Sequence, residues 1–165
     1  KIREYLNQTR EYSDVFSALN LAGLVDAAVV FAPKNQVIDT PIHILYITVQ
    51  EASPTFSQPH CLIVAEPGSN GSIVEDYAVI GKGATFTNAV TQIWVGENAA
   101  VNHTRLQRES GEAIHIGKTA IAQARDSRYT CTAISLGGKI SRHNLEVLQT
   151  GEQTETTLNG LTMIA

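Results

Sequence analysis

The residues best suited to chemistry in this sequence are its histidines and cysteines, because imidazole and thiol groups bind metals and exchange protons near neutral pH. They are His43, His60, His103, His115, His143, Cys61 and Cys131. The two cysteines lie far apart in the sequence, so they form neither a CxxC motif nor a four-cysteine zinc site. A disulfide scaffold is excluded as well, and two free thiols are typical of a reducing compartment.

One alignment within the sequence, based on the repeat described below, brings an imidazole close to a carboxylate. It places His103 near Glu75 and Arg105 near Tyr77. Such a histidine could ligate a metal or move a proton. The simpler interpretation is a solvated cross-strand pair on an outer face of a sheet, and this is what we expect.

The other histidines and Cys131 give weaker indications. His115 and His143 are separated by one full repeat, which could stack them, but a shorter last repeat aligns His143 with Gly117 instead. Cys131 has no neighbouring cysteine, so we expect a small buried thiol rather than a cluster ligand. We therefore assign no catalytic, cofactor-binding or metal-binding residue, and no cofactor.

Two short motifs resemble nucleotide-binding loops but lack their required residues. Residues 117–119, Gly-Lys-Thr, would need a glycine at position 112, where the chain has Glu112, and no amphipathic helix follows. Residues 81–83, Gly-Lys-Gly, fail the dinucleotide pattern in the same way.

Three carboxylates are expected to occupy equivalent positions in the turns of successive repeats and to point away from one another into water. They are Glu97, Asp126 and Glu152.

The composition narrows the class of protein. The net charge is −4, which argues against a nucleic-acid groove, and no stretch approaches the 18 apolar residues of a membrane span. Valine, isoleucine and threonine make up 44 of the 165 residues, a β-branched content that favours strands.

The elements that must position these residues follow from the hydrophobic pattern. Apolar residues at helical spacing predict one short helix at 13–22, with Ser13 or Asp14 as its N-cap and Gly23 at its end. From residue 25 onward, short apolar runs alternate with small polar turns, which predicts strands. The runs cover 25–31, 37–49, 86–95, 114–124 and 140–149, with a Ser/Pro-containing insertion at 53–59.

The turns repeat with a period of about 28 residues, as the spacings from Gly68 to Gly96, Arg125 and Gly151 show. Two strands of about ten residues and two turns make one flattened coil of a solenoid. We therefore predict an all-β fold, a parallel β-helix over residues 25–165 preceded by a helical segment over 1–24. The same spacing predicts stacked columns of residues. One column, in a turn, contains Asn70, Asn98, Ser127 and Gln153. Two columns lie in strands: the first contains Val90, Thr119 and Leu145, and the second contains Ile93, Ala122 and Leu148.

From about residue 13 to 165, several segments resemble, in order and in register, the core of the SufB/SufD family of the SUF iron–sulfur cluster assembly machinery. They are Ser17-Ala18-Leu19-Asn20, Pro41-Ile42-His43-Ile44-Leu45-Tyr46, Ile73-Val74-Glu75-Asp76-Tyr77, Phe86-Thr87-Asn88-Ala89-Val90-Thr91, Leu106-Gln107-Arg108-Glu109-Ser110, Ser135-Leu136-Gly137-Gly138 and Thr157-Leu158-Asn159-Gly160-Leu161. The segments at 106–110 and 135–138 look more like SufD than like its paralogue SufB.

This resemblance implies a right-handed parallel β-helix in a non-enzymatic scaffold protein. It implies pairing with a SufB-like paralogue or with a second copy, and binding of the ATPase SufC through a C-terminal domain that this chain lacks. It places the protein in the cytoplasm, or in the plastid stroma of a eukaryote. The family histidine associated with cluster assembly lies beyond residue 165, so His103, His115, His143 and Cys131 inherit no role. The chain ends in the apolar run 161–165, so we expect it to continue into further coils or to pair through that end.

Two other functions are compatible with a β-solenoid. A polysaccharide lyase or hydrolase would need paired carboxylates in a cleft fed by long loops, whereas the turns here are short and aromatic residues make up 6%. An acyltransferase with hexapeptide repeats would need about 18 residues per coil, which does not fit the longer period found here.

Overall fold

The computed structural model describes residues 5, 14–50, 53–109 and 111–163, most of which form two parallel β-sheets. Sheet A contains β1 (Ala28–Ala32), β4 (His60–Ala65), β6 (Thr85–Val95), β8 (Ala113–Gln123) and β10 (Ile140–Gln149), with β3 (Thr55–Ser57) beside β6. Sheet B contains β2 (Val37–Val49), β5 (Asn70–Ile80), β7 (Ala100–Arg108), β9 (Arg128–Leu136) and β11 (Glu155–Met163).

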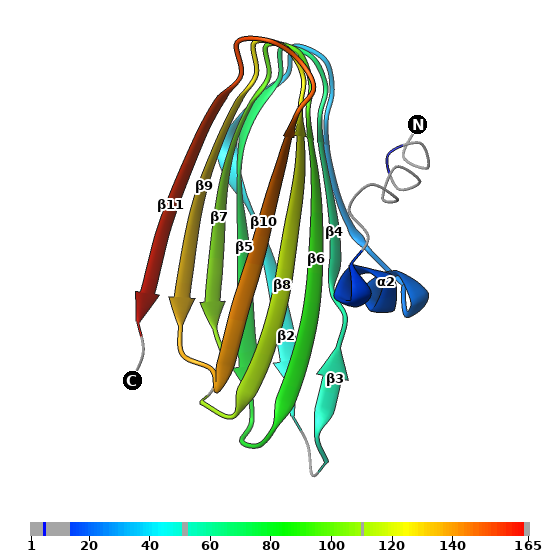
Figure 1. The fold of residues 1–165 in the computed structure, drawn as a ribbon, viewed down its shortest axis with the longest axis vertical. Helices are drawn as coiled ribbons and strands as arrows, with labels where there is room; N and C mark the ends of the chain where they lie inside the picture. Colours follow the sequence, from blue (N-terminus) through cyan, green and yellow to red (C-terminus); the bar gives the residue numbers. More distant parts are fainter. Residues whose placement is uncertain (1–4, 6–13, 51–52, 110, 164–165) are drawn as a thin grey trace.

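The chain winds alternately through the two sheets, so that each coil places one strand in sheet A and one in sheet B (Figure 1). Every strand pair between successive coils is parallel. Ile73 pairs with His103 and His103 with Cys131, so each coil advances the chain by close to the predicted period. The predicted parallel β-helix, with two long strands in each coil, is therefore confirmed. The strand predicted at 37–49 has those bounds, and the later runs lie within a residue or two of theirs.

Each turn at one end of the coils (Figure 1, top) contains one residue with a left-handed backbone conformation. The residues with positive φ in this column are Asn35, Gly68, Asn98, Asp126 and Gln153, with φ between 56° and 71°. The backbone N–H groups of the first four donate to carbonyl oxygens of the neighbouring coil. The acceptors are, in the same order, Pro67, Glu97, Arg125 and Glu152. The predicted turn column was wrong for Asn70 and Ser127, because Asn70 pairs instead with Ala100 inside the sheet.

The same register corrects the predicted acidic column. Asn98 and Asp126 occupy equivalent turn positions, so the residue equivalent to Glu97 is Arg125, and the next in the column is Glu152. A cation therefore lies between the two glutamates, and Arg125 Nε is 3.1 Å from the Asp126 carboxylate. The stack of three carboxylates that the spacing predicted does not form.

Two predicted strand columns were wrong by one residue. Thr119 pairs with Thr91 and Leu145, not with Val90. Likewise Ile93 pairs with Ile121, which pairs with Val147, so that Ala122 and Leu148 belong to another column. A shift of one residue moves a side chain to the opposite face of a sheet, so these alignments grouped inward-facing side chains with outward-facing ones.

The interior between the sheets has an apolar half and a polar half. The half nearest the left-handed turns is a hydrophobic cluster that includes Ile63, Ile73, Ile93, Val101 and Ile121, all of which are at most 4% exposed. Farther along the same strands, the inward side chains are mostly charged or hydroxylated. Buried charges need hydrogen-bond or ion-pair partners, so the charged groups of the polar half must find these partners among one another.

Helix α2 (Val15–Ala22) confirms the predicted helix, with Asp14 as its N-cap and Gly23 at its C-terminus, whereas Ser13 lies outside the described residues. Asp14 Oδ1 accepts hydrogen bonds from the backbone N–H groups of Phe16 and Ser17 at 2.9 and 3.0 Å. The helix lies against the outer side of sheet A (Figure 1). In the part of the chain that the structure describes, no helix is long and apolar enough to span a membrane.

Polar contacts hold this helix on the sheet. Asn20 is fully buried, and its amide donates to the carbonyl oxygens of Asn88 and Pro59 at 2.7 and 3.1 Å. Its Oδ1 lies 2.8 Å from His60 Nδ1, which therefore carries the proton of that contact. At the start of the helix, Lys118 Nζ lies 2.9 Å from the Asp14 carboxylate.

Candidate functional site

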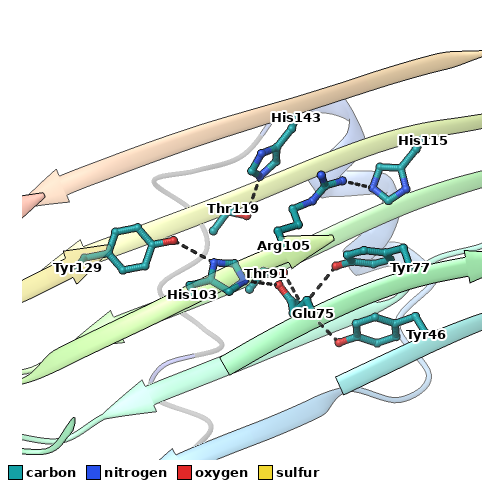
Figure 2. A network of polar contacts seen from close by, with 10 residues as sticks. All are labelled: Tyr46, Glu75, Tyr77, Thr91, His103, Arg105, His115, Thr119, Tyr129 and His143. Carbon is teal, nitrogen blue, oxygen red and sulfur yellow. Dashed lines mark hydrogen bonds and ion pairs between the residues drawn. The ribbon is translucent and has the colours of Figure 1, made fainter. Parts of the chain in front are cut away.

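The polar half of the interior is centred on the carboxylate of Glu75, which is completely buried on β5 (Figure 2). His103 Nε2 lies 2.8 Å from Glu75 Oε2, and the Thr91 hydroxyl lies 2.8 and 3.0 Å from the two carboxylate oxygens. The phenols of Tyr77 and Tyr46 donate to Oε1 at 3.3 and 3.5 Å. One buried carboxylate therefore collects donors from strands β2, β5, β6 and β7.

The protonation states in this centre follow from the competition between burial and the contacts. Burial alone would raise the pKa of Glu75, but the hydrogen bond and charge of His103 and the hydrogen bond from Thr91 keep it below the usual value. Burial alone would lower the pKa of His103, yet its contacts with Cys131 and Glu75 raise it to about 9. Glu75 and His103 are therefore a buried ion pair, and the second imidazole nitrogen of His103 lies 3.0 Å from the Tyr129 hydroxyl.

A second centre lies next to the first and has a different division of charge. His115 Nδ1 and the Thr87 hydroxyl each lie 2.6 Å from the carboxylate of Glu109. Burial and the charge of Arg105 lower the pKa of His115 despite its carboxylate partner. A neutral His115 donates from Nδ1 to Glu109. At Nε2 it accepts a hydrogen bond from Arg105 (Figure 2). The positive charge that balances Glu109 is thus that of Arg105, transmitted through an imidazole.

The buried guanidinium has a site shaped for it. Arg105 is 2% exposed, and its Cζ lies 5.3 Å from the centre of the Tyr77 ring, a cation–π contact. On the facing sheet, a Cβ atom at Gly117 would lie 2.9 Å from Arg105 Nη2 and 3.1 Å from His115 Nε2. Any larger residue than glycine at position 117 would therefore press on both side chains.

The predicted contacts between side chains are confirmed, and their predicted environment was wrong. His103 does reach Glu75, and Arg105 does reach Tyr77. Both pairs lie inside the solenoid, and the His103 and Glu75 side chains are 0% exposed rather than solvated on an outer face. The contacts are diagonal, because His103 is paired in register with Ile73 and Arg105 with Glu75.

The register of the last coil decides which residues His115 and His143 pair with. His143 pairs with Gly117, as the shorter last repeat implied, and its Nε2 lies 2.9 Å from the Thr119 hydroxyl. Within the described ranges, no group of three or more His, Cys, Asp or Glu side chains could hold a metal ion. Cys131 is a buried free thiol as expected, and so is Cys61.

The motifs that resembled nucleotide-binding loops have other structures. Residues 117–119 lie within strand β8, where Lys118 is 5% exposed and its Nζ also lies 3.1 Å from the Glu146 carboxylate. Residues 81–83 form the connection between β5 and β6, and both glycines there have positive φ.

Sequence reasoning did not assign Glu109, Thr87 or Tyr46 to this site. Alternation along β7 contained a usable signal. Val101, His103, Arg105, Gln107 and Glu109 occupy every second position, so burial of Val101 sends the other four inward. The signal was ambiguous because Leu106, an apolar residue, lies in the opposite phase, on the outer face.

Comparison with known proteins identifies the family of this fold. Residues 46–165 match the family described as SUF system FeS cluster assembly, SufBD core domain. The chain belongs to the SufB/SufD family. The matched range runs from the end of β2 through the last strand, so it covers most of the stacked coils and includes Glu75, His103, Arg105 and Glu109.

Individual relatives agree with this membership. An iron-sulfur cluster assembly SufBD family protein of Synechocystis is 42% identical over 173 aligned residues, which cover 100% of this chain and 38% of the relative. The protein ABCI7, chloroplastic, of Arabidopsis thaliana is 31% identical, over 96% of this chain and 34% of the relative. The iron-sulfur cluster assembly protein SufD of Bacillus subtilis is 33% identical, over 68% and 26%.

The chain thus spans about a third of the length of these relatives. Their names and the family description support a role in iron–sulfur cluster assembly.

Proposed function

We propose that this chain is the β-helix core of a non-catalytic scaffold in the SUF iron–sulfur cluster assembly machinery. The observation that carries the proposal is that the SufBD core match, residues 46–165, covers most of the stack of parallel coils. In this role the coils provide a rigid body that brings together a second SufB- or SufD-type subunit and the ATPase SufC, which binds a domain beyond residue 165. The scaffold works in the cytoplasm of a bacterium or in the plastid stroma.

The site geometry supports a structural role for the interior charges. The carboxylates of Glu75 and Glu109 and the cations of His103 and Arg105 are balanced against one another, and all four residues are at most 5% exposed. Their contacts with Thr87, Thr91 and His115 on sheet A join the two sheets. A polysaccharide enzyme, the alternative function, would need its carboxylates exposed in an open cleft, whereas Glu75 and Glu109 are at most 5% exposed.

Anaerobic affinity purification of the full natural chain tests the proposal, with co-purifying proteins identified by mass spectrometry. The expected result is recovery of a SufB-like paralogue and an ABC-type ATPase in near-stoichiometric amounts, with no turnover by this subunit alone. Recovery of the protein without either partner at low and high salt would overturn the scaffold role. A matched purification from cells that lack the ATPase should retain the paralogue, which separates the two contacts.

A further inference from the structure

A row of apolar side chains crosses the outer face of sheet A, beside helix α2. The row consists of Phe56, Phe86, Ile114 and Ile140, which are paired in register across β3, β6, β8 and β10. The next residues of β6 and β8, Thr87 and His115, point into the interior, so the row points outward. Phe56 and Ile140 are 48% and 51% exposed, and the rings of Phe56 and Phe86 are stacked with their centres 4.9 Å apart.

Helix α2 adds two more apolar side chains next to this row. Ser17 and Leu21 lie on one side of the helix, where they line a small space together with Val90. Since successive residues of a helix are about 100° apart, Phe16 and Leu19 lie on the other side, toward the row, whose β6 member precedes Val90 in the strand. Leu19 is 41% exposed, and Phe16 is half-buried. Phe16, Leu19 and the row form one apolar surface, the apolar shelf, and contiguous apolar surface with a polar rim is typical of an interaction site.

The placement of helix α2 shows which kind of element fits this face. Its polar contacts lie, in order along the chain, with Lys118 on β8, Asn88 on β6 and His60 on β4, so the helix crosses the strands (Figure 1). A helix rises about 5.4 Å per turn and strands lie about 4.8 Å apart, so a helix in this direction places about one side chain per turn on each strand. A second helix beside α2 would place its residues i, i+4, i+7 and i+11 on the four members of the row. The row lies two residues from Asn88 and four from Val90, about 7 to 13 Å along the strands, which spans the usual separation of about 8 to 10 Å between packed helix axes.

The charged side chains around the apolar shelf are mostly cations. The described ones are Lys82 in the connection between β5 and β6, Glu112 and Lys139 just before β8 and β10, and Arg142 on the outer face of β10. None of these four forms an ion pair with a described residue, and Arg142 Nε donates instead to Asn144 Oδ1 at 3.0 Å. The carboxylates of Asp14 and Glu146 on the same face both lie against Lys118. Three cations and one carboxylate at the rim complement a partner surface that is acidic.

We propose that the apolar shelf binds an amphipathic α-helix of a partner protein. The apolar stripe of that helix lies on the shelf beside α2, and glutamate or aspartate residues along its edges pair with Lys139 and Arg142. The rim repels a basic helix, and the row offers a purely polar helix no apolar surface to bury against, so the partner needs both features. This inference goes beyond the proposed function and does not depend on it.

Fluorescence anisotropy of a labelled synthetic peptide, titrated with the full natural chain, tests the shelf. The probe is a helical peptide of about 14 residues with leucine at positions i, i+4, i+7 and i+11, glutamate along both edges of this stripe and alanine elsewhere. A second peptide has lysine in place of each glutamate. We expect saturable binding of the glutamate peptide, and binding of the lysine peptide that is weaker by about tenfold or more. Equal binding of the two peptides, or no saturable binding of the glutamate peptide, would overturn the proposal, and adsorption to anionic phospholipid vesicles in the latter case would assign the shelf to a membrane surface.

Three variants locate the binding. Lys139→Glu combined with Arg142→Glu leaves one cation and three carboxylates at the rim, so this double variant should prefer the lysine peptide. Lys34→Glu combined with Arg128→Glu makes the same change of charge at exposed positions away from the shelf, and should keep the natural preference. Phe56→Ser removes an outward-facing ring and should weaken binding of the glutamate peptide by about tenfold, with an unchanged unfolding midpoint. An unchanged preference in the first double variant, or unchanged affinity in Phe56→Ser, would show that the peptide binds elsewhere and overturn the proposal.

Discussion

At the scale of single residues, the interior of this β-helix is organised by charge balance. Glu75 faces His103 directly, whereas Glu109 faces Arg105 through a neutral imidazole. Two similar histidine–glutamate contacts therefore carry different protonation states. Burial and then the charge of Arg105 lower the pKa of His115, whereas contacts with Cys131 and Glu75 raise the pKa of His103. Removing one member of such a set leaves the others buried and uncompensated.

The first prediction concerns Glu75→Gln, which keeps the shape of the side chain and removes its charge. We expect the free energy of unfolding to fall by about 3 to 5 kcal/mol, because His103 loses its counter-charge while remaining buried. Urea unfolding measures this loss, and NMR titration should show the pKa of His103 falling below about 9. Glu97→Gln, at an exposed turn position, is the control and should change stability by less than about 0.5 kcal/mol. Equal stability of the two variants would contradict a buried ion pair.

The second prediction concerns Gly117→Ala. The new methyl group would lie within 3.1 Å of both Arg105 and His115, and we expect a loss of about 1 to 3 kcal/mol in unfolding free energy from overpacking. Gly160→Ala is the matched control, because a methyl group there meets nothing within 4 Å. Chemical denaturation of both variants measures the difference. A neutral Gly117→Ala would mean that the guanidinium has room to move.

At the scale of elements, the contact between helix α2 and sheet A is unusual in its polarity. Asn20, Asn88 and Lys118 supply most of its anchoring contacts, while Val15 on the outer side of the helix is 79% exposed. A helix held by a few specific hydrogen bonds depends strongly on each of them.

Asn20→Ala tests this dependence. The substitution leaves the carbonyl oxygens of Pro59 and Asn88 without their side-chain donor and removes the acceptor of His60 Nδ1. We expect faster hydrogen exchange across Val15–Ala22 and a loss of about 1 to 3 kcal/mol in stability. Val15→Ala, which removes an exposed side chain of the same helix, should leave both quantities nearly unchanged. Slow exchange in Asn20→Ala would mean that other contacts hold the helix.

At the scale of the whole molecule, the coils form a stack in which each strand depends on its neighbours, as is general for solenoids. The buried ion pair links β5 with β7, and Tyr129 on β9 extends the contact to the next coil. Its protonation should therefore affect the stability of the entire stack rather than that of one strand.

The pH dependence of unfolding is the corresponding prediction. The pKa of His103 is raised to about 9 in the folded protein and is about 6.5 in an unfolded chain. Its stabilising contribution is therefore complete below about pH 6.5 and is lost as the pH rises through about 9. Glu75, with a lowered folded pKa, contributes stability that is lost as the pH falls below its unfolded value of about 4.3. Urea unfolding across this range should show the alkaline loss in the natural protein and a weaker one in Glu75→Gln. An equal alkaline loss in both would exclude the pair as its cause.

The sequence by itself determined the fold and the family. The regular period of the turns, the alternating apolar runs and the cap residues of the helix are local features, and the fold confirms the strands and the helix that they predict. Of the two N-cap candidates, the structure has Asp14. The contact of His103 with Glu75 was also within reach, because the period places the two residues within two positions of register on adjacent coils. Only the tertiary structure decided which face of each strand lies inside. Alternation has two phases, both faces of β7 carry polar residues, and turns of unequal length shift the alignment by the single residue that exchanges the faces. The charged network, which is the candidate site, is buried because the phase of the alternation turns its side chains toward the interior.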